Sequence, residues 1–192
     1  MKNEVLIEVS ARHVHLSQEH IDILFGEGYS LTPDKWLSQP GQFLSKERIK
    51  IVGAKKNFEN AGILGPARKA SQVELSLTDC YSIGIIAPVR ESGNIAGTPG
   101  LELSTEKGKV TLTEGLIVAQ RHIHMTPKDA LELGLNDKEI VSVKVNTSRG
   151  LTFENVVVRV RSDFALYMHI DTDEANAAGI GKEQVFGQII KK

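Results

Sequence analysis

The chain is poor in cysteine, and this scarcity limits both its covalent chemistry and its metal chemistry. Cys80 is the single cysteine among 192 residues. One thiol cannot form a disulfide within the chain, so a disulfide-stapled secreted fold is excluded. A zinc site built from several thiolates is excluded as well, and any transition metal must be bound through histidine and carboxylate side chains.

The sequence also lacks a strong charge imbalance and a long hydrophobic run. Its 23 basic and 24 acidic residues are interspersed and give a formal net charge of -1, which argues against a nucleic acid or an anionic membrane as partner. No segment approaches the ~20 apolar residues needed to cross a bilayer. The N-terminal MKNEVLIEVS has acids within its apolar run and no signal-peptide core. We therefore expect a cytoplasmic protein that acts on small molecules.

Short strands separated by turn residues dominate the rest of the pattern. Apolar and polar residues alternate in NEVLIEVS and IVSVKVN, as in half-buried strands. We expect QVELSLT and SIGIIAPV to be strands too, and the proline-interrupted segment 31–47 to be irregular. The hydrophobic content of 41% can supply the core of one large domain or two small ones. Many short strands with few helices predict a mainly β protein of barrel or sandwich type.

Three short helices are expected from residues that favour helix starts. Helix-like runs begin at Ser17, Thr126 and Thr172, and each of these side chains can accept a hydrogen bond from the first helical turn. Pro127 suits the first position of the second helix, and Gly134 is a plausible stop. We expect these helices to cap the ends of barrels.

One five-residue pattern occurs twice, as RHVHL at 12–16 and RHIHM at 121–125. Residues two apart in a strand face the same side, so each copy presents two imidazoles on one face. A single pair is more simply two strand histidines, but a duplicated pair in a chain with 6 histidines favours metal binding. Five candidates exceed one tetrahedral site, so we predict two neighbouring sites with the open positions of a catalytic metal. The histidine candidates are His13, His15, His122, His124 and His169.

A second pattern places an arginine and an acid close together in the sequence. Arg68 follows a Gly-Pro turn, and Gln72 and Glu74 lie two apart at the head of an expected strand, hence on one face. Glu74 is a candidate metal ligand and Arg68 a candidate anion clamp, although each taken alone is more simply a solvated surface residue. Arg90 lies in the glycine-rich segment 87–100, which suits either a phosphate loop or a long hairpin turn.

Together, these stretches resemble the phosphate propanoyltransferase family, the phosphotransacylases typified by the enzyme of propanediol-using bacterial microcompartments. The resemblance runs from about residue 5 to the end of the chain, with all motifs in order. It implies two closed six-stranded antiparallel β-barrels capped by short helices. One barrel would comprise residues 1–11 and 120–192, and the other residues 12–119 with an irregular insertion. The stretches that carry it are VSARHVHLS, GPARKASQVELSLTD, APVRESGNIAGTPG, VAQRHIHMT and MHIDTDEAN.

The same resemblance implies a role for each candidate residue. One zinc would be bound by His13, His15 and Glu74, with the sulfur of coenzyme A as its fourth ligand. A second zinc, which keeps waters, would be bound by His122, His124 and His169. Arg68 would bind phosphate and act in catalysis. The implied contacts to coenzyme A are Val9, Ser10, Ala11, Lys55 and Asn176.

The activity implied by the resemblance is the interconversion of propanoyl-CoA or acetyl-CoA plus phosphate with acyl phosphate plus coenzyme A. Two alternatives from other classes stay open. A dinuclear metallohydrolase or thioesterase would also use histidine pairs, although its usual H-x-H-x-D-H run is absent. A non-catalytic metal-binding module would need the metals only for folding. A homodimer is compatible with the resemblance, and the short segment before VLIEVS favours a free enzyme over one targeted to a microcompartment.

Overall fold

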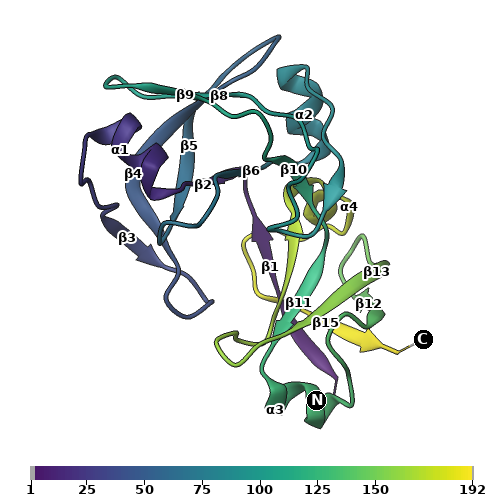
Figure 1. Ribbon diagram of the computed structural model, residues 1–192. Helices are drawn as coiled ribbons and strands as arrows, with labels where there is room; N and C mark the ends of the chain where they lie inside the picture. The colour runs from purple at the N-terminus through teal and green to yellow at the C-terminus, as the bar shows by residue number, and fades with distance from the viewer. Residues whose placement is uncertain (1–2, 192) are drawn as a thin grey trace. The chain divides into compact units, whose positions relative to one another are not determined.

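The computed structural model describes residues 3–191 and divides into two compact units (Figure 1). Strands make up most of the regular structure in both, which confirms the mainly β class. Among the described residues, no helix is both long and apolar enough to cross a membrane. Unit 1 comprises the chain up to Ser10, Ser38–Pro40 and the chain from Gln120 onward; unit 2 comprises Ala11–Leu37 and Gly41–Ala119.

Unit 1 contains the expected closed barrel of six strands, in the order β1-β14-β11-β13-β12-β15. The pairing is mixed, because β1 with β14 and β11 with β13 run parallel whereas the other neighbours are antiparallel. Parallel neighbours need a crossover connection, and β11 reaches β13 through a helix and β12. The strands are β1 (Glu4–Ser10), β11 (His122–Met125), β12 (Ile140–Val145), β13 (Leu151–Val160), β14 (Tyr167–Asp171) and β15 (Val185–Ile190).

Aliphatic side chains fill the interior of this barrel. Val5 and Ile7 of β1 are buried, as are Val141, Val143 and Val145 of β12, so the period of two read from the sequence holds in both strands. Burial of such a cluster supplies most of the favourable free energy of folding, at about 25 cal/mol for each Å² of apolar surface removed from water.

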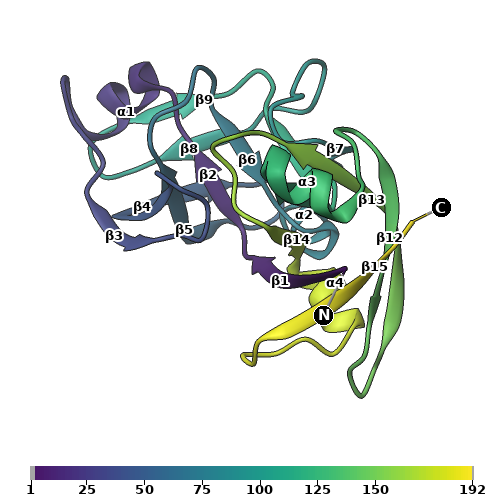
Figure 2. The same ribbon diagram turned by 90° about the horizontal axis from the view of Figure 1, so that it is seen from below.

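Two short helices follow the strands that carry the second histidine group. Helix α3 (Pro127–Leu133) follows β11, and helix α4 (Thr172–Ala177) follows β14. Because β11 and β14 are antiparallel, the helices lie at opposite ends of the barrel (Figures 1 and 2). Thr126 caps α3 as expected, whereas the N-cap of α4 is Asp171, whose side chain accepts a hydrogen bond from the Glu174 amide.

Unit 2 contains a nine-stranded sheet that curls into a half-barrel, in the order β7-β10-β6-β2-β5-β4-β8-β9 with β3 added to β4. The end strands β7 and β9 are two and three residues long, so the hydrogen-bonded ladder stops there. The first strands are β2 (His13–His15), β3 (Pro33–Trp36), β4 (Phe43–Val52), β5 (Phe58–Gly65) and β6 (Gln72–Glu74). They are followed by β7 (Val89–Arg90), β8 (Glu102–Ser104), β9 (Lys109–Thr111) and β10 (Leu116–Ala119). Helix α1 (Gln18–Phe25), capped by Ser17, packs against β9, and helix α2 (Leu77–Ile83) follows β6.

Unit 2 differs from the expectation in its sheet, which is open and nine-stranded and is not a closed six-stranded barrel, and also in three local stretches. SIGIIAPV (82–89), expected to be a strand, contains the end of α2 and irregular backbone before Val89. The segment expected to be irregular contains β3, an edge strand whose residues are all exposed, and Pro33 is tolerated because it is the first residue of that strand. The stretch expected to continue as strand after Glu74 is α2, because the Ser76 side chain accepts a hydrogen bond from the amide of Asp79 and starts a helix. Helix α2 therefore begins three residues after a candidate metal ligand.

Candidate metal centres

In unit 2 the first histidine pair faces Glu74 across two antiparallel strands. His13 is paired in register with Glu74, and His15 with Gln72, so β2 and β6 present these side chains to one another. The Nε2 atoms of His13 and His15 lie 3.4 and 3.5 Å from the two carboxylate oxygens of Glu74. All three residues are buried, and their potential ligand atoms lie within 4.8 Å of one another. The structure thus brings together three of the predicted ligands as one group.

Backbone carbonyls orient both imidazoles of this pair. The Nδ1 atom of His13 lies 2.8 Å from the carbonyl oxygen of Ala11, and that of His15 lies 3.3 Å from the carbonyl oxygen of Leu64. A carbonyl oxygen only accepts, so Nδ1 carries a proton in each ring, and Nε2 is the nitrogen that faces Glu74 and is available to a metal once it is deprotonated. This second contact to the backbone is typical of metal-binding histidines.

The protonation states within this group also favour a cation. Burial lowers the pKa of His15 to about 4, so its imidazole is neutral near pH 7. Burial opposes ionisation of Glu74, but the charge and hydrogen bond of His13, with a smaller contribution from His15, hold the pKa of its carboxyl well below the usual range. A carboxylate and an imidazole lone pair therefore converge in a buried place, where a bound cation would offset the cost of the charge.

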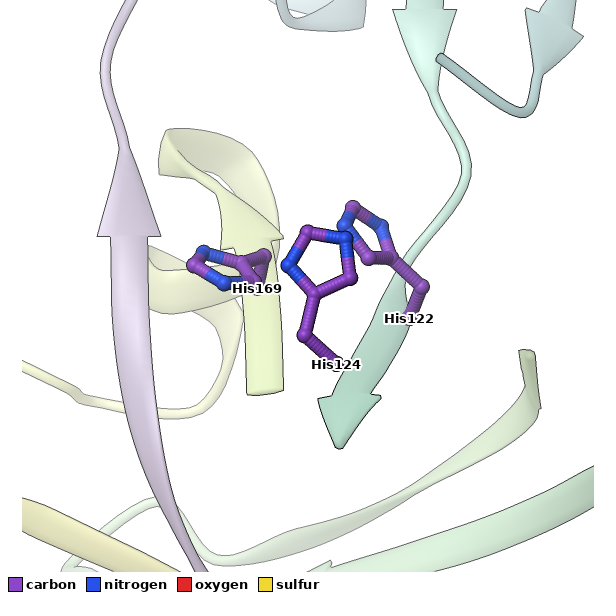
Figure 3. Close-up of side chains that lie close together, drawn as sticks. All are labelled: His122, His124 and His169. Carbon is purple, nitrogen blue, oxygen red and sulfur yellow. The ribbon is translucent and has the colours of Figure 1, made fainter. Parts of the chain in front are cut away.

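The second group lies in unit 1 and consists of three histidines. His122 and His124 come from β11, and His169 from β14 is paired in register with His122. The ring centroids are 4.5 to 5.2 Å apart, and the rings converge on a common space (Figure 3). The Nδ1 atom of His122 lies 2.8 Å from the carbonyl oxygen of Gln120, two residues earlier, as His13 does with Ala11.

His124 carries the clearest sign of a ligand in the second group. Both of its ring nitrogens are buried, and neither has a hydrogen-bond partner among the described residues. A buried polar atom without a partner costs about 1–3 kcal/mol, and a metal bound to one nitrogen would remove part of that cost. Burial, followed by the neighbouring His122 and His169, lowers the pKa of His124, which keeps the lone pairs available. Phe164 stacks on the ring at 4.0 Å between centroids and fixes its plane.

Gln39 contacts this group and was missed by the sequence analysis. Its Nε2 lies 3.4 Å from Nε2 of His169, and its amide also exchanges two 3.1 Å hydrogen bonds with the backbone of Ala165. Glu8 of β1 lies on the other side of His169, with 3.7 Å between its Oε2 and Nδ1. No local pattern marks Gln39, because it reaches the barrel from a segment 130 positions away from His169.

Glu74 is connected to Arg68 through Ser92. The Ser92 hydroxyl lies 2.8 Å from Oε1 of Glu74 and 3.2 Å from Nη1 of Arg68. Gln72 donates to the same carboxylate oxygen at 2.5 Å and to Ser92 at 2.9 Å. Arg68 is thus held beside the first metal group, as the sequence suggested, whereas Ser92 was missed. Arg90, the other arginine considered, is exposed and donates only to the neighbouring Val89 carbonyl among the described contacts.

The internal duplication extends beyond the histidines. Arg12, which precedes the first pair, forms two hydrogen bonds of 2.7 and 3.0 Å to Asp79, five residues after Glu74. Arg121, which precedes the second pair, pairs at 3.1 Å with Glu174, five residues after His169. In both units the acid is in the first turn of the helix that follows the strand of the third candidate ligand.

A phenylalanine completes the correspondence. The guanidinium of Arg12 lies 4.2 Å from the ring centroid of Phe58, and that of Arg121 lies 5.5 Å from that of Phe153. Phe58 lies four residues before Gly62, which pairs in parallel with His13. Phe153 lies four residues before Val157, which pairs in parallel with His122. The same framework of three strands and one helix is therefore built twice, each time around a potential metal group.

The Arg12–Asp79 pair should contribute measurably to stability. Asp79 is only 9% exposed at its side chain, so Arg12→Ala leaves a buried carboxylate without its main partner. We expect a loss of about 1–3 kcal/mol in the free energy of unfolding, measured by urea titration. Arg161→Ala is the matched control, because its pair with Asp163 is also bidentate but lies at 61% and 59% exposure. That control should cost less than about 1 kcal/mol, and equal losses would contradict the prediction.

The residues expected to contact coenzyme A are distributed over both units. Val9 and Ser10 are in β1 and Asn176 is in α4, all in unit 1, whereas Ala11 and Lys55 are in unit 2. Val9, Ala11, Lys55 and Asn176 are exposed, and Ser10 is half-buried. All five are accessible to a ligand within their own unit.

The fold and the two groups define a mainly β protein with a potential metal centre in each of two units, one of them linked to an arginine. The family model for phosphate propanoyltransferase matches residues 6–181. A phosphate propanoyltransferase of Listeria monocytogenes is 58% identical over 192 residues, which cover 100% of this chain and 90% of the relative. A relative of the same name from Clostridioides difficile is 55% identical, and the match covers 100% of this chain and 92% of the relative. Another, from Thermotoga maritima, is 53% identical, and the match covers 91% of this chain and 83% of the relative. The chain belongs to the phosphate propanoyltransferase family and is an enzyme of the acyltransferase class.

Proposed function

We propose that the protein transfers short acyl groups between coenzyme A and phosphate: propanoyl-CoA or acetyl-CoA plus phosphate gives acyl phosphate plus coenzyme A, and the reverse. Family membership supports the reaction class. The observation that carries the assignment of residues is the link from Arg68 through Ser92 to Glu74, because it joins an anion-binding side chain to a potential metal group.

We further propose zinc as the metal of both groups. Their donors are imidazole nitrogens and a carboxylate, which zinc accepts, and three protein donors leave a position open for a substrate. The buried, unpartnered nitrogens of His124 fit a metal better than they fit a metal-free protein. Zinc bound at the first group would act as a Lewis acid and lower the pKa of a coordinated thiol below its usual ~8.5.

Arg68 would bind and orient the phosphate. A guanidinium offers parallel N–H donors that match two phosphate oxygens. One of its nitrogens is bound to Ser92, which fixes the plane of the group before phosphate arrives. A phosphate oxygen then forms a bond to the thioester carbonyl carbon, the C–S bond breaks, and sulfur leaves with the bonding electrons. Cys80 is buried in the core of unit 2, so direct transfer is favoured over an acyl-enzyme.

The remaining assignments rest on the resemblance. We propose that coenzyme A contacts Val9, Ser10, Ala11, Lys55 and Asn176. The domains proposed are residues 1–11 with 120–192, and residues 12–119. A homodimer and a cytoplasmic location stay predictions.

The proposal predicts thiol release that depends strictly on phosphate. Purified protein should release coenzyme A from propanoyl-CoA and acetyl-CoA only when phosphate is present, and a zinc chelator should abolish the release until zinc is restored. A thiol reagent follows the reaction directly, and the ratio of kcat/KM values ranks the two substrates. Release without phosphate would instead support a thioesterase. Absence of release from protein with its full metal content would support a structural metal module.

A further inference from the structure

Ser92 is the point at which three functional side chains meet. Its hydroxyl oxygen lies 2.8 Å from Glu74 Oε1, 2.9 Å from Gln72 Nε2 and 3.2 Å from Arg68 Nη1. Ser92 follows the short strand β7 within the glycine-rich loop, whereas Gln72 and Glu74 are in β6. The hydroxyl therefore connects a loop, a strand and the arginine that precedes the strand.

The direction of each of these hydrogen bonds is fixed by chemistry. Guanidinium and amide nitrogens only donate, and a carboxylate only accepts. The single hydrogen of Ser92 must then point to Glu74, and its two lone pairs accept from Arg68 and Gln72. The hydrogen-bonding capacity of the hydroxyl is fully used, so the serine has one preferred orientation.

Gln72 is held in a matching orientation. It is 2% exposed, and its Oε1 accepts a 2.7 Å hydrogen bond from the backbone amide of Gly93. That contact places Nε2 toward Glu74 and Ser92, where its two hydrogens are both used. The Oε1 atom of Glu74 thus receives two hydrogen bonds and lies 3.5 Å from Nε2 of His15, while Oε2 faces Nε2 of His13 at 3.4 Å. The network distinguishes the two oxygens of the carboxylate, because Gln72 and Ser92 both donate to Oε1, and it fixes the plane in which the carboxylate faces the two histidines.

We propose that Ser92 is a positioning residue that couples the phosphate-binding arginine to the metal-binding carboxylate. The inference deepens the proposed function and rests on it for the roles of Arg68 and Glu74. An anion on Arg68 holds the guanidinium in the plane that donates to Ser92, and this strengthens the hydrogen bond from Ser92 to Glu74. A metal on Glu74 requires the same orientation of the serine. Phosphate and metal therefore each raise the affinity of the other, and the coupling is reciprocal.

The test compares Ser92→Ala, which removes the hydroxyl, with Ser92→Thr, which keeps it. Ser30→Ala is the matched control, since Ser30 is an exposed serine of the same unit. Ser92→Ala should raise the KM for phosphate about 10-fold or more, with a smaller change in kcat, because orientation of the bound anion is lost. Ser92→Thr should keep most of the native KM, and Ser30→Ala all of it.

Zinc affinity provides a readout that does not depend on activity. It is measured by competition with a chromogenic chelator in a His122→Ala background, so that titration reports the unit 2 group. Ser92→Ala should weaken zinc binding about 10–100-fold, as loss of a residue that orients a ligand typically does. When Ser92 is present, inorganic phosphate should tighten zinc binding about 5-fold or more. The same addition of phosphate should not tighten zinc binding in Ser92→Ala. Phosphate itself binds free zinc to the same extent whichever variant is present. The effect of phosphate on zinc affinity is therefore compared between variants measured in the same buffer.

The inference fails if Ser92→Ala stays within twofold of the native chain in both the KM for phosphate and the zinc affinity. It also fails if Ser92→Thr loses as much as Ser92→Ala, because the hydroxyl would then not be the cause. Failure of the proposed function is distinguishable. A chain that binds zinc but releases no thiol with phosphate would refute the reaction, while the zinc titration would still decide the role of Ser92.

Discussion

Arg68→Ala should lower the phosphate-dependent rate of thiol release by about 10²–10³-fold at subsaturating phosphate, because both the charge and the paired donors that orient the anion are lost. Arg68→Lys should recover only part of the rate, since an ammonium keeps the charge but lacks the planar fork. The measurement is kcat/KM for phosphate at fixed acyl-CoA. The loss should lie mainly in this parameter and not in the KM for acyl-CoA.

Arg90→Ala is the matched control for this result. The sequence places Arg90 in a glycine-rich segment that suits either a phosphate loop or a hairpin turn, and the structure leaves it exposed on β7 with a hydrogen bond to the adjacent backbone. Its replacement should change kcat/KM for phosphate by less than about threefold, as expected of a screened surface charge. Equal losses in the two variants, or an unchanged rate in Arg68→Ala, would contradict the assignment of Arg68.

The histidine groups could be predicted from the sequence because they depend on local geometry. His13 and His15 are two apart in a strand, and so are His122 and His124, which places each pair on one face whatever the surrounding fold. The third members are different. Glu74 and His169 lie opposite the first histidine of each pair only through strand register, which the periodicity of one strand does not contain. Both were candidates from their residue type and position, but their assignment to these two groups came from the resemblance to a family.

Ser92 and Gln39 could not be predicted, and the reasons differ. Ser92 is an ordinary serine of a glycine-rich loop until the loop folds over β6 and brings it to Glu74. Gln39 becomes relevant because a short segment of the central sequence joins the contacts of unit 1. Both are long-range contacts made by irregular backbone, where neither a helical nor a strand period applies.

Helix α2 was missed for a more local reason. The hydrophobic residues after Glu74 were interpreted as continuing strand, although Ser76 and Asp79 have the spacing of a helix N-cap with an acid in the first turn. This helix matters for the site, because Asp79 is the residue that binds Arg12. The acid at the equivalent place in the other unit, Glu174, binds Arg121 in the same way. Comparison of the two copies would have revealed the helix, since the run after His169 was correctly interpreted as helical.

Removal of one ligand from each group should separate the two metal centres. His13→Ala and His122→Ala should each lose about one zinc equivalent per chain relative to the native protein, because the ligands of each group come from a single unit. Metal content is measured by elemental analysis after gel filtration. His13→Ala should lower the rate of thiol release by at least about 10²-fold, since the zinc proposed for this group would be the one beside Arg68 and would supply several kcal/mol of transition-state stabilisation.

His20→Ala is the matched control, because His20 is the histidine outside both groups and contacts Ser71 at 2.7 Å. It should retain both zinc equivalents. Loss of both equivalents in either ligand variant would show that the groups do not bind metal independently, and retention of both would show that the imidazoles are not ligands. The rate of His122→Ala then assigns the second centre. A rate close to native would make the second metal structural, with its effect confined to thermal stability. A loss of rate as large as that of His13→Ala would give the second metal a part in the reaction. The duplicated framework would then hold two metals that both act on the substrates.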